Sequence, residues 1–181
     1  MKNTALLLID IQKDYFPGGR NPLVGVEAAA ENTRAALEFF RKKGLPLFFV
    51  KHIAEPGSSF FSPGTEGVEI CERLRPLAAE RIIEKHAPDS FYRTELQAAL
   101  KEKEIKTLVV CGMMTHMCVD TTVRSAASLD YDVILLADCC ATKDLLWKDE
   151  PIPAVLVQKT YLASLDGTFA KVMNSADFLG F

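Results

Sequence analysis

Short apolar runs alternate along the chain with segments whose apolar residues recur every three or four positions. Residues 4–10 (TALLLID), 46–53 and 107–111 (TLVVC) are such runs. Continuous apolar runs of this length are typical of parallel strands that are buried on both faces. Within residues 26–43 the apolar positions fall at intervals of three and four, which predicts an amphipathic helix that ends at Gly44.

The same alternation continues through the rest of the chain. The remaining predicted strands are residues 81–85, 132–137 and 169–173, and the remaining predicted helices are residues 94–104, 116–129 and 152–165. Residues 54–67 are rich in Gly, Pro and Ser and form a predicted loop. Strands that alternate with helices predict a three-layer α/β fold, a doubly wound (Rossmann-like), mostly parallel six-stranded sheet with helices on both faces.

Composition narrows the class of protein. The 181 residues are 49% hydrophobic and 25% charged, with a formal net charge of −3, which is typical of one folded domain over residues 1–181. The absence of basic runs argues against nucleic acid or an anionic membrane as partners. No apolar run reaches the ~18 residues of a spanning helix. The five cysteines show no CxxC spacing, which favours a reduced cytoplasmic protein.

Three residues that carry chemistry end or follow predicted strands. Asp10 ends the first strand, Lys85 ends the strand 81–85, and Cys118 begins the helix after residues 107–111. Ligand sites in open parallel sheets lie beyond the carboxyl ends of the strands, so these residues should meet at one edge. A carboxylate, an ammonium and a thiol together form an activated-nucleophile set.

Each of these residues also has a simpler explanation. Cys118 could be a buried packing thiol, Asp10 a cap for the next turn, and Lys85 a strand-end lysine that reaches solvent. If Cys118 lies at a helix N-terminus, the positive end of that helix should lower the thiol pKa from ~8.5. Free N–H groups at the same place could also hold an oxyanion.

Four segments in order make the sequence resemble the isochorismatase-like cysteine hydrolase family. They are LIDIQKDYF (8–16), PGTEG (63–67), the stretch from Lys85 to FYRTEL (91–96), and GMMTHMCV (112–119), the most specific of the four. The resemblance covers nearly the whole chain. The family includes nicotinamidases, carbamoyl-sarcosine and ureido hydrolases, and isochorismatases.

The resemblance implies a catalytic triad of Asp10, Lys85 and Cys118. It also implies a cis peptide between Met113 and Met114, and an oxyanion hole formed by the N–H groups of Met114 and Cys118. In the implied reaction Cys118 attacks a carbonyl carbon, Asp10 takes the thiol proton and passes it to the leaving amine, and water hydrolyses the thioester. Lys85 holds Asp10 in its charged form.

The sequence departs from the nicotinamidase branch, which binds a metal through an Asp and histidines after its second strand. Residues 50–57 contain only His52, so we expect neither a metal nor another cofactor, and His52 becomes a pocket or structural residue. Apolar side chains near the strand ends could form a wall for a small planar substrate, or could simply pack in the core. The candidates are Phe16, Phe60, Phe61 and Phe91.

The leading prediction is a metal-independent hydrolase that cleaves a C–N bond of a small amide or ureide. A vinyl-ether hydrolase acting on an isochorismate-like dianion is an alternative, with Arg20 and Lys51 as weak candidates for its cationic partners. A catalytically silent binding protein and a thiol-redox protein are two more. The family usually forms dimers or tetramers, so we expect a homo-oligomer, in which Trp147 could be a contact or a lid.

Overall fold

The computed structural model describes residues 1–180. Within that range six parallel strands form one sheet in the order β3-β2-β1-β4-β5-β8. This confirms the α/β prediction, including the number of strands. The strands are β1 (Thr4–Ile9), β2 (Leu47–His52), β3 (Arg81–Lys85), β4 (Thr107–Met113), β5 (Asp132–Ala141) and β8 (Lys171–Met173).

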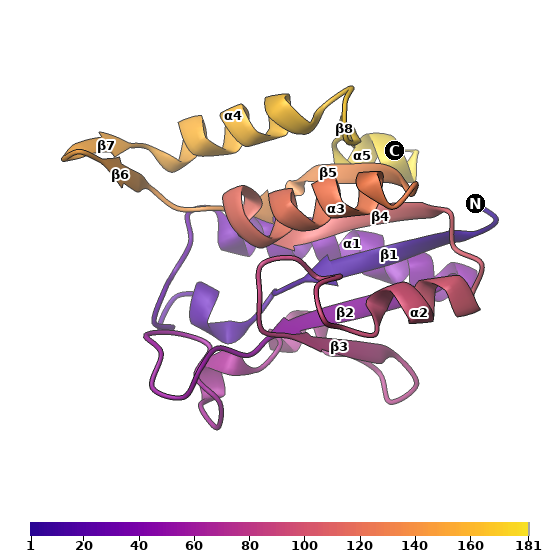
Figure 1. Ribbon diagram of the computed structural model, residues 1–181, viewed down its shortest axis with the longest axis horizontal. Coiled ribbons are helices and arrows are strands. Elements are labelled where there is room, and N and C mark those ends of the chain that lie inside the picture. Colours follow the sequence, from indigo (N-terminus) through magenta and orange to yellow (C-terminus); the bar gives the residue numbers. More distant parts are fainter. Residues whose placement is uncertain (181) are drawn as a thin grey trace.

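Helices cover both faces of this sheet (Figure 1). One face carries α1 (Val26–Lys43) and α5 (Ser175–Leu179). The opposite face carries α2 (Leu96–Glu102), α3 (Asp120–Ser128) and α4 (Ala154–Leu165). Short 3-10 helices lie in the connections, at Lys13–Tyr15, Glu66–Val68 and Glu72–Leu74.

The central strand β1 shows how the apolar runs build two cores. All six of its residues are buried. Leu6 and Leu8 belong to the core under α1, whereas Leu7 and Ile9 belong to the core under α2 and α3. Because successive side chains of a strand point to opposite faces, a continuous apolar run is needed to fill both layers.

The chain between β4 and β5 departs from a regular helix. The predicted helix 116–129 begins instead with a π-helical turn, Thr115–Val119, which runs directly into α3. Single π-helical turns are rare and are frequent at functional sites.

Two features after β5 escaped prediction. The strands β6 (Leu145–Trp147) and β7 (Glu150–Ile152) pair as an antiparallel hairpin, and Figure 1 shows this hairpin projecting from the body of the molecule. The helix α5 follows β8 at the end of the described chain. No helix among residues 1–180 is both long enough and apolar enough to cross a bilayer.

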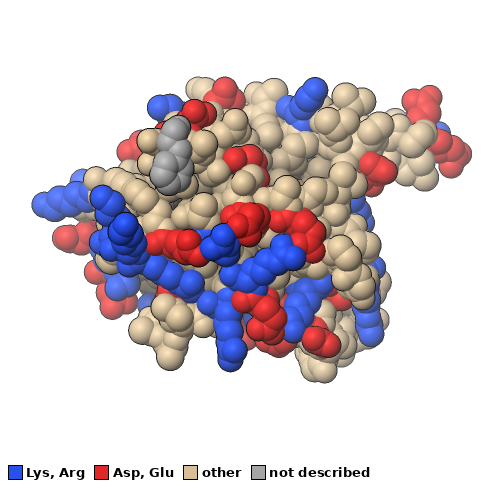
Figure 2. Space-filling model, turned by 180° about the vertical axis from the view of Figure 1, so that it is seen from behind, with Lys and Arg blue, Asp and Glu red and all other residues tan. Residues whose placement is uncertain are grey.

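Charged side chains of both signs interleave on the face of the molecule seen in Figure 2. On α1, Arg34 pairs with Glu31 and Glu38, and Arg41 pairs with Glu80 at 2.7 Å. The charges of Arg34 and Arg41 are therefore balanced locally by nearby carboxylates.

Candidate active site

Asp10, Lys85 and Cys118 meet at the carboxyl edge of the sheet. Asp10 directly follows β1, Lys85 is the last residue of β3, and Cys118 lies in the π-helical turn after β4. Asp10 and Lys85 are fully buried, and Cys118 is 7% exposed. The parallel strands end at the same edge, so residues 108 positions apart in sequence are brought together.

The Lys85 ammonium occupies the centre of this cluster. Its Nζ lies 2.8 Å from Asp10 Oδ2, 3.2 Å from Cys118 Sγ and 2.9 Å from His52 Nδ1. It also donates to the carbonyl oxygen of Ala87 at 3.0 Å. Four acceptors therefore surround a group with three protons, which fixes the ammonium in place and satisfies its charge although it is buried.

The electrostatics of the cluster favour a neutral thiol beside an ion pair. Burial opposes the charge of Lys85, but the Asp10 carboxylate and the Cys118 sulfur outweigh burial, and the pKa of Lys85 is raised. Burial, followed by the Asp10 charge, raises the pKa of Cys118, and Lys85 offsets this only in part. The pKa of Cys118 is thus raised and not lowered as expected, because burial and the Asp10 charge outweigh the Lys85 charge.

The turn before Cys118 offers unused hydrogen-bond donors. The peptide bond between Met113 and Met114 is cis. In the described part of the chain the Met114 N–H donates no hydrogen bond, whereas the Met114 carbonyl accepts from Met117 and Val119. A free N–H group next to a nucleophile is a donor of the kind that an oxyanion requires.

Gln12 is a site residue to which the sequence analysis gave no role. Its Oε1 accepts from the His52 N–H at 2.8 Å, and its Nε2 donates to the His52 carbonyl at 2.9 Å and to the Val68 carbonyl at 2.8 Å. Gln12 is fully buried. It therefore locks the end of β2, and with it His52, to the segment after β1. The sequence feature that could have identified Gln12 is its polar side chain two residues after Asp10, between Ile11 and Lys13.

One of the four phenylalanines adjoins His52, and a second packs against it. The ring of Phe61 lies 5.9 Å from the His52 ring and 5.0 Å from the Phe60 ring. Both also pack on Tyr15. The buried Asp14 carboxylate accepts the Phe61 N–H at 2.6 Å, so the loop that carries these rings is fixed against the segment after β1.

The other two phenylalanines lie elsewhere. Phe91 stacks on Tyr131 at 5.9 Å, next to the amino end of β5, because Asp89 and Ser90 tie its loop to Ser125 and Thr122 of α3. The structure does not bring Phe91 to the cluster.

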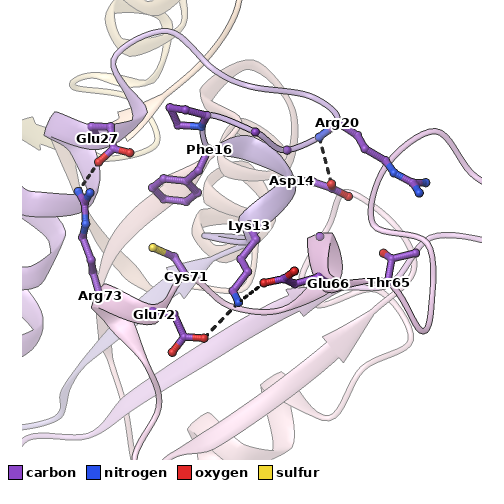
Figure 3. A pocket seen from close by; sticks show the side chains of 14 residues that line it. Lys13, Asp14, Phe16, Arg20, Glu27, Thr65, Glu66, Cys71, Glu72 and Arg73 are labelled. Atoms are coloured by element: carbon purple, nitrogen blue, oxygen red, sulfur yellow. Dashed lines mark hydrogen bonds and ion pairs between the residues drawn. The ribbon is translucent and has the colours of Figure 1, made fainter.

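Phe16 packs beside Cys71 in a surface hollow of about 560 Å³ (Figure 3). The residues that line this hollow include none of Asp10, Lys85 and Cys118. This hollow is therefore separate from the candidate active site.

A metal fits this site poorly. Asp10, His52 and Cys118 each offer one potential ligand atom, and these atoms lie within 4.8 Å of one another. The Lys85 ammonium, however, lies within 3.2 Å of an atom of all three and uses the lone pairs that a metal would need. A divalent cation would have to displace a buried positive charge, which is electrostatically unfavourable.

The remaining candidates from the sequence lie outside the cluster. All five cysteines are free thiols. His116 contacts Thr142 at 2.5 Å, and His86 lies on the exposed side of the strand end and contacts the Ile53 carbonyl. Lys51 pairs with Glu69 at 3.0 Å. Cys118 is thus the cysteine that contacts the buried ion pair.

Comparison with known proteins places this site in a family. The model of the Isochorismatase domain matches residues 4–177, so the chain belongs to the isochorismatase family. An uncharacterized isochorismatase family protein of Bacillus subtilis, YddQ, is 49% identical over 97% of this chain and 98% of its own. The secreted isochorismatase effector Isc1 of Verticillium dahliae is 32% identical over 97% and 90%.

Solved structures agree with this assignment. A putative isochorismatase hydrolase from Oleispira antarctica has a TM-score of 0.96 at 39% identity, covering 99% of this chain and 97% of its own. N-carbamoylsarcosine amidase from Thermoplasma acidophilum has a TM-score of 0.80 at 27% identity, covering 97% of both chains. The central parallel sheet with its flanking helices is therefore the family fold.

Proposed function

We propose that the protein is a metal-independent cysteine hydrolase that cleaves the C–N bond of a small amide or ureide through a thioester on Cys118. One observation carries this proposal. A buried ammonium, Lys85 Nζ, lies within 3.2 Å of both a buried carboxylate and the Cys118 sulfur. A buried charge pair contributes little net stability, and titratable groups with perturbed pKa values beside a thiol are typical of functional sites.

In the first half of the reaction the Cys118 sulfur attacks the carbonyl carbon while Asp10 accepts the thiol proton. The free N–H of Met114 donates to the oxyanion of the tetrahedral intermediate, and the Cys118 N–H is the proposed second donor. When the C–N bond breaks, Asp10 returns the proton to the leaving nitrogen. The amine departs and the acyl group remains on the sulfur.

In the second half a water molecule attacks the thioester carbonyl, and Asp10 accepts a proton from it. The C–S bond breaks, the proton goes to the sulfur, and a carboxylic acid leaves. Lys85 stays positively charged throughout, since Asp10 and Cys118 raise its pKa. It compensates the negative charge that moves between Asp10, the oxyanion and the sulfur. A relative named as an amidase supports the choice of a C–N bond.

Vinyl-ether hydrolysis of an isochorismate-like acid is the second candidate, favoured by the similarity to a protein named an isochorismatase effector. Its dianionic substrate needs cations that are not already paired. Lys51 is paired with Glu69, and Arg20 lines the separate hollow of Figure 3. Within the cluster the charges of Asp10 and Lys85 cancel. This balance favours a neutral amide over a dianion.

Product analysis separates the two candidates. Wild type and Cys118→Ala are assayed for ammonia or amine release from a panel of amides and ureides, and for pyruvate release from isochorismate. The proposal expects Cys118-dependent amine release from at least one member of the panel. Pyruvate release that persists in Cys118→Ala, without amine release by wild type, would overturn it in favour of the second candidate.

We also propose that the protein works as a homo-oligomer. Apolar side chains stand exposed on the β6–β7 hairpin and on the adjoining start of α4: Leu146, Trp147, Val155 and Leu156. A lone two-stranded hairpin is marginal in water, and a second copy could cover it. Light scattering should find a dimer or larger species for wild type and a smaller one for Leu146→Ser/Trp147→Ser. A monomeric wild type at micromolar concentration would contradict this.

A further inference from the structure

His52 touches the catalytic ammonium, and its backbone is held on both sides. It ends β2 directly opposite Lys85 in the β2–β3 register. Its N–H and its carbonyl are both bonded to the Gln12 amide. From this fixed position its ring Nδ1 lies 2.9 Å from Lys85 Nζ.

The contact with Lys85 determines which ring nitrogen carries the proton. An ammonium has three donors and no acceptor, so His52 Nδ1 must offer its lone pair. Lys85 is kept charged by the Asp10 carboxylate at 2.8 Å. The His52 imidazole is therefore neutral, and its proton is on Nε2. Burial, followed by the Lys85 charge, also lowers the pKa of His52, which favours the same neutral form.

The Nε2–H group is then free to donate. The His52 ring is half-buried beside Phe61. Among the described residues, Lys85 is the sole hydrogen-bond partner of the ring, and it uses Nδ1. A rigid ring thus touches the catalytic lysine with one nitrogen and keeps a donor on the other.

We propose that His52 is a substrate-positioning residue, held by Lys85 as the Nε2–H tautomer, which donates to a second hydrogen-bond acceptor on the substrate. The inference rests on the proposed function and narrows its substrate class. Favoured substrates are amides or ureides that carry a further carbonyl or carboxylate oxygen near the scissile carbonyl. A substrate that presents only a hydrogen-bond donor at that position would bring its proton against the Nε2–H proton of His52. Such a substrate should therefore bind poorly.

The charges that face His52 set the effect of pH. They are Lys85 from β3, Asp10 after β1, Cys118 in the π-helical turn, and the neighbouring His86. Protonation of His52 would place an N–H against the Lys85 ammonium and break their contact. Because the pKa of His52 is lowered, this loss is expected only on the acid side of the ordinary histidine pKa of about 6.5.

Nitrogen NMR of protein labelled with ¹⁵N-histidine tests the tautomer without any substrate. His52 is one of three histidines, and substitution of His86 and His116 in turn assigns its signals. At pH 7 we expect a protonated Nε2 and an unprotonated Nδ1 for His52. In Lys85→Met the His52 pKa should move upward toward its ordinary value. An Nδ1–H tautomer in wild type overturns the inference.

Two substitutions of His52 separate the kinetic effect of its Nδ1 contact with Lys85 from that of the proposed Nε2–H contact with the substrate. Asparagine can place an amide oxygen near Nδ1 and so retain an acceptor for Lys85, whereas glutamine can place an N–H group near Nε2. On a substrate with a second acceptor, His52→Asn should raise KM by roughly five- to tenfold with kcat nearly unchanged, and His52→Gln should restore KM in part. On a matched substrate without that acceptor, the increase in KM for His52→Asn should be several-fold smaller.

The outcomes distinguish this inference from the proposed function. Equal losses of His52→Asn on both substrates would overturn the inference while Cys118-dependent turnover still stood. Amide turnover that survives in Cys118→Ala would refute the proposed function instead, whichever tautomer the NMR spectrum shows.

Discussion

Two clusters of mixed charge, one in the surface hollow and one at the sheet edge, differ in burial. In the surface hollow of Figure 3, Lys13 bridges Glu66 at 3.0 Å and Glu72 at 3.1 Å, and the two carboxylate side chains are 84% and 69% exposed. At the sheet edge, Lys85 lies 2.8 Å from Asp10 with both side chains fully buried. The pairs are alike in chemistry and in distance, so burial is the property that separates them.

Burial changes what each cluster contributes. An exposed ion pair contributes about 0–1 kcal/mol because water and salt screen it. A buried pair gains little net stability, but removal of one partner leaves an uncompensated charge and costs about 3–5 kcal/mol. The ion pairs of the hollow are thus solvated surface pairs. The buried ion pair at the sheet edge contributes little to the stability of the fold, so stability alone does not explain its presence. That difference points to chemistry at Asp10, Lys85 and Cys118.

The largest expected effect is on turnover. Cys118→Ala should lower the rate of amide hydrolysis by at least about a thousandfold, since the nucleophile is lost, while circular dichroism shows an intact fold. Cys71→Ala is the matched control, because Cys71 is also buried but lies in the hollow. Equal losses of hydrolysis rate in Cys118→Ala and Cys71→Ala would contradict the assignment of catalysis to the buried cluster alone.

The next effect is on stability. Lys85→Met leaves the Asp10 carboxylate buried without its partner and should reduce the free energy of unfolding by about 3–5 kcal/mol at pH 7, measured with urea. Asp10→Asn/Lys85→Met should recover part of this loss. Lys13→Met, in the hollow, should leave the free energy of unfolding nearly unchanged, because water and salt screen its ion pairs. Similar losses for the two lysine variants would contradict the comparison.

A smaller effect concerns the reactivity of the thiol. The Asp10 charge raises the pKa of Cys118, so Asp10→Asn should move the pH profile of Cys118 alkylation to lower pH. Lys85 lowers that pKa, so Lys85→Met should move the profile to higher pH. Mass spectrometry of iodoacetamide-treated protein follows each cysteine separately. If neither substitution shifts the pH profile of alkylation, the Cys118 thiol is not electrostatically coupled to Asp10 and Lys85.

The smallest effect is expected in the hollow. Glu72→Gln removes one of the two carboxylates that contact Lys13, and both the stability and the hydrolysis rate should stay within experimental error. Urea unfolding and the amide assay check this together. A clear loss of activity would assign the hollow a part in substrate binding.

The central strands β1 and β4 were predicted well because they are continuous apolar runs with no competing pattern. The sequence analysis missed the β6–β7 hairpin because three-residue strands such as Leu145–Trp147 carry almost no periodic signal. The sequence placed Asp10, Lys85 and Cys118 at one edge from topology alone, and the geometry agrees.

Other features of the site depend on tertiary contacts that local patterns do not encode. Phe91 was misplaced because its loop is tied to α3 by Asp89 and Ser90. The direction of the Cys118 pKa shift was misjudged because burial and the Asp10 carboxylate, which both raise the pKa, arise from tertiary packing. The Nδ1 contact of His52 with Lys85 follows from strand register, which the sequence alone did not give.

The central claim is a covalent acyl group on Cys118, and acid-quenched mass spectrometry tests it most directly. Wild type is mixed with an amide from the panel, quenched within one turnover and digested. The account predicts that the peptide containing Cys118 gains the mass of the acyl group and that Cys118→Ala shows neither this adduct nor turnover. Amide turnover by Cys118→Ala, with no adduct on the wild-type peptide, would contradict the account.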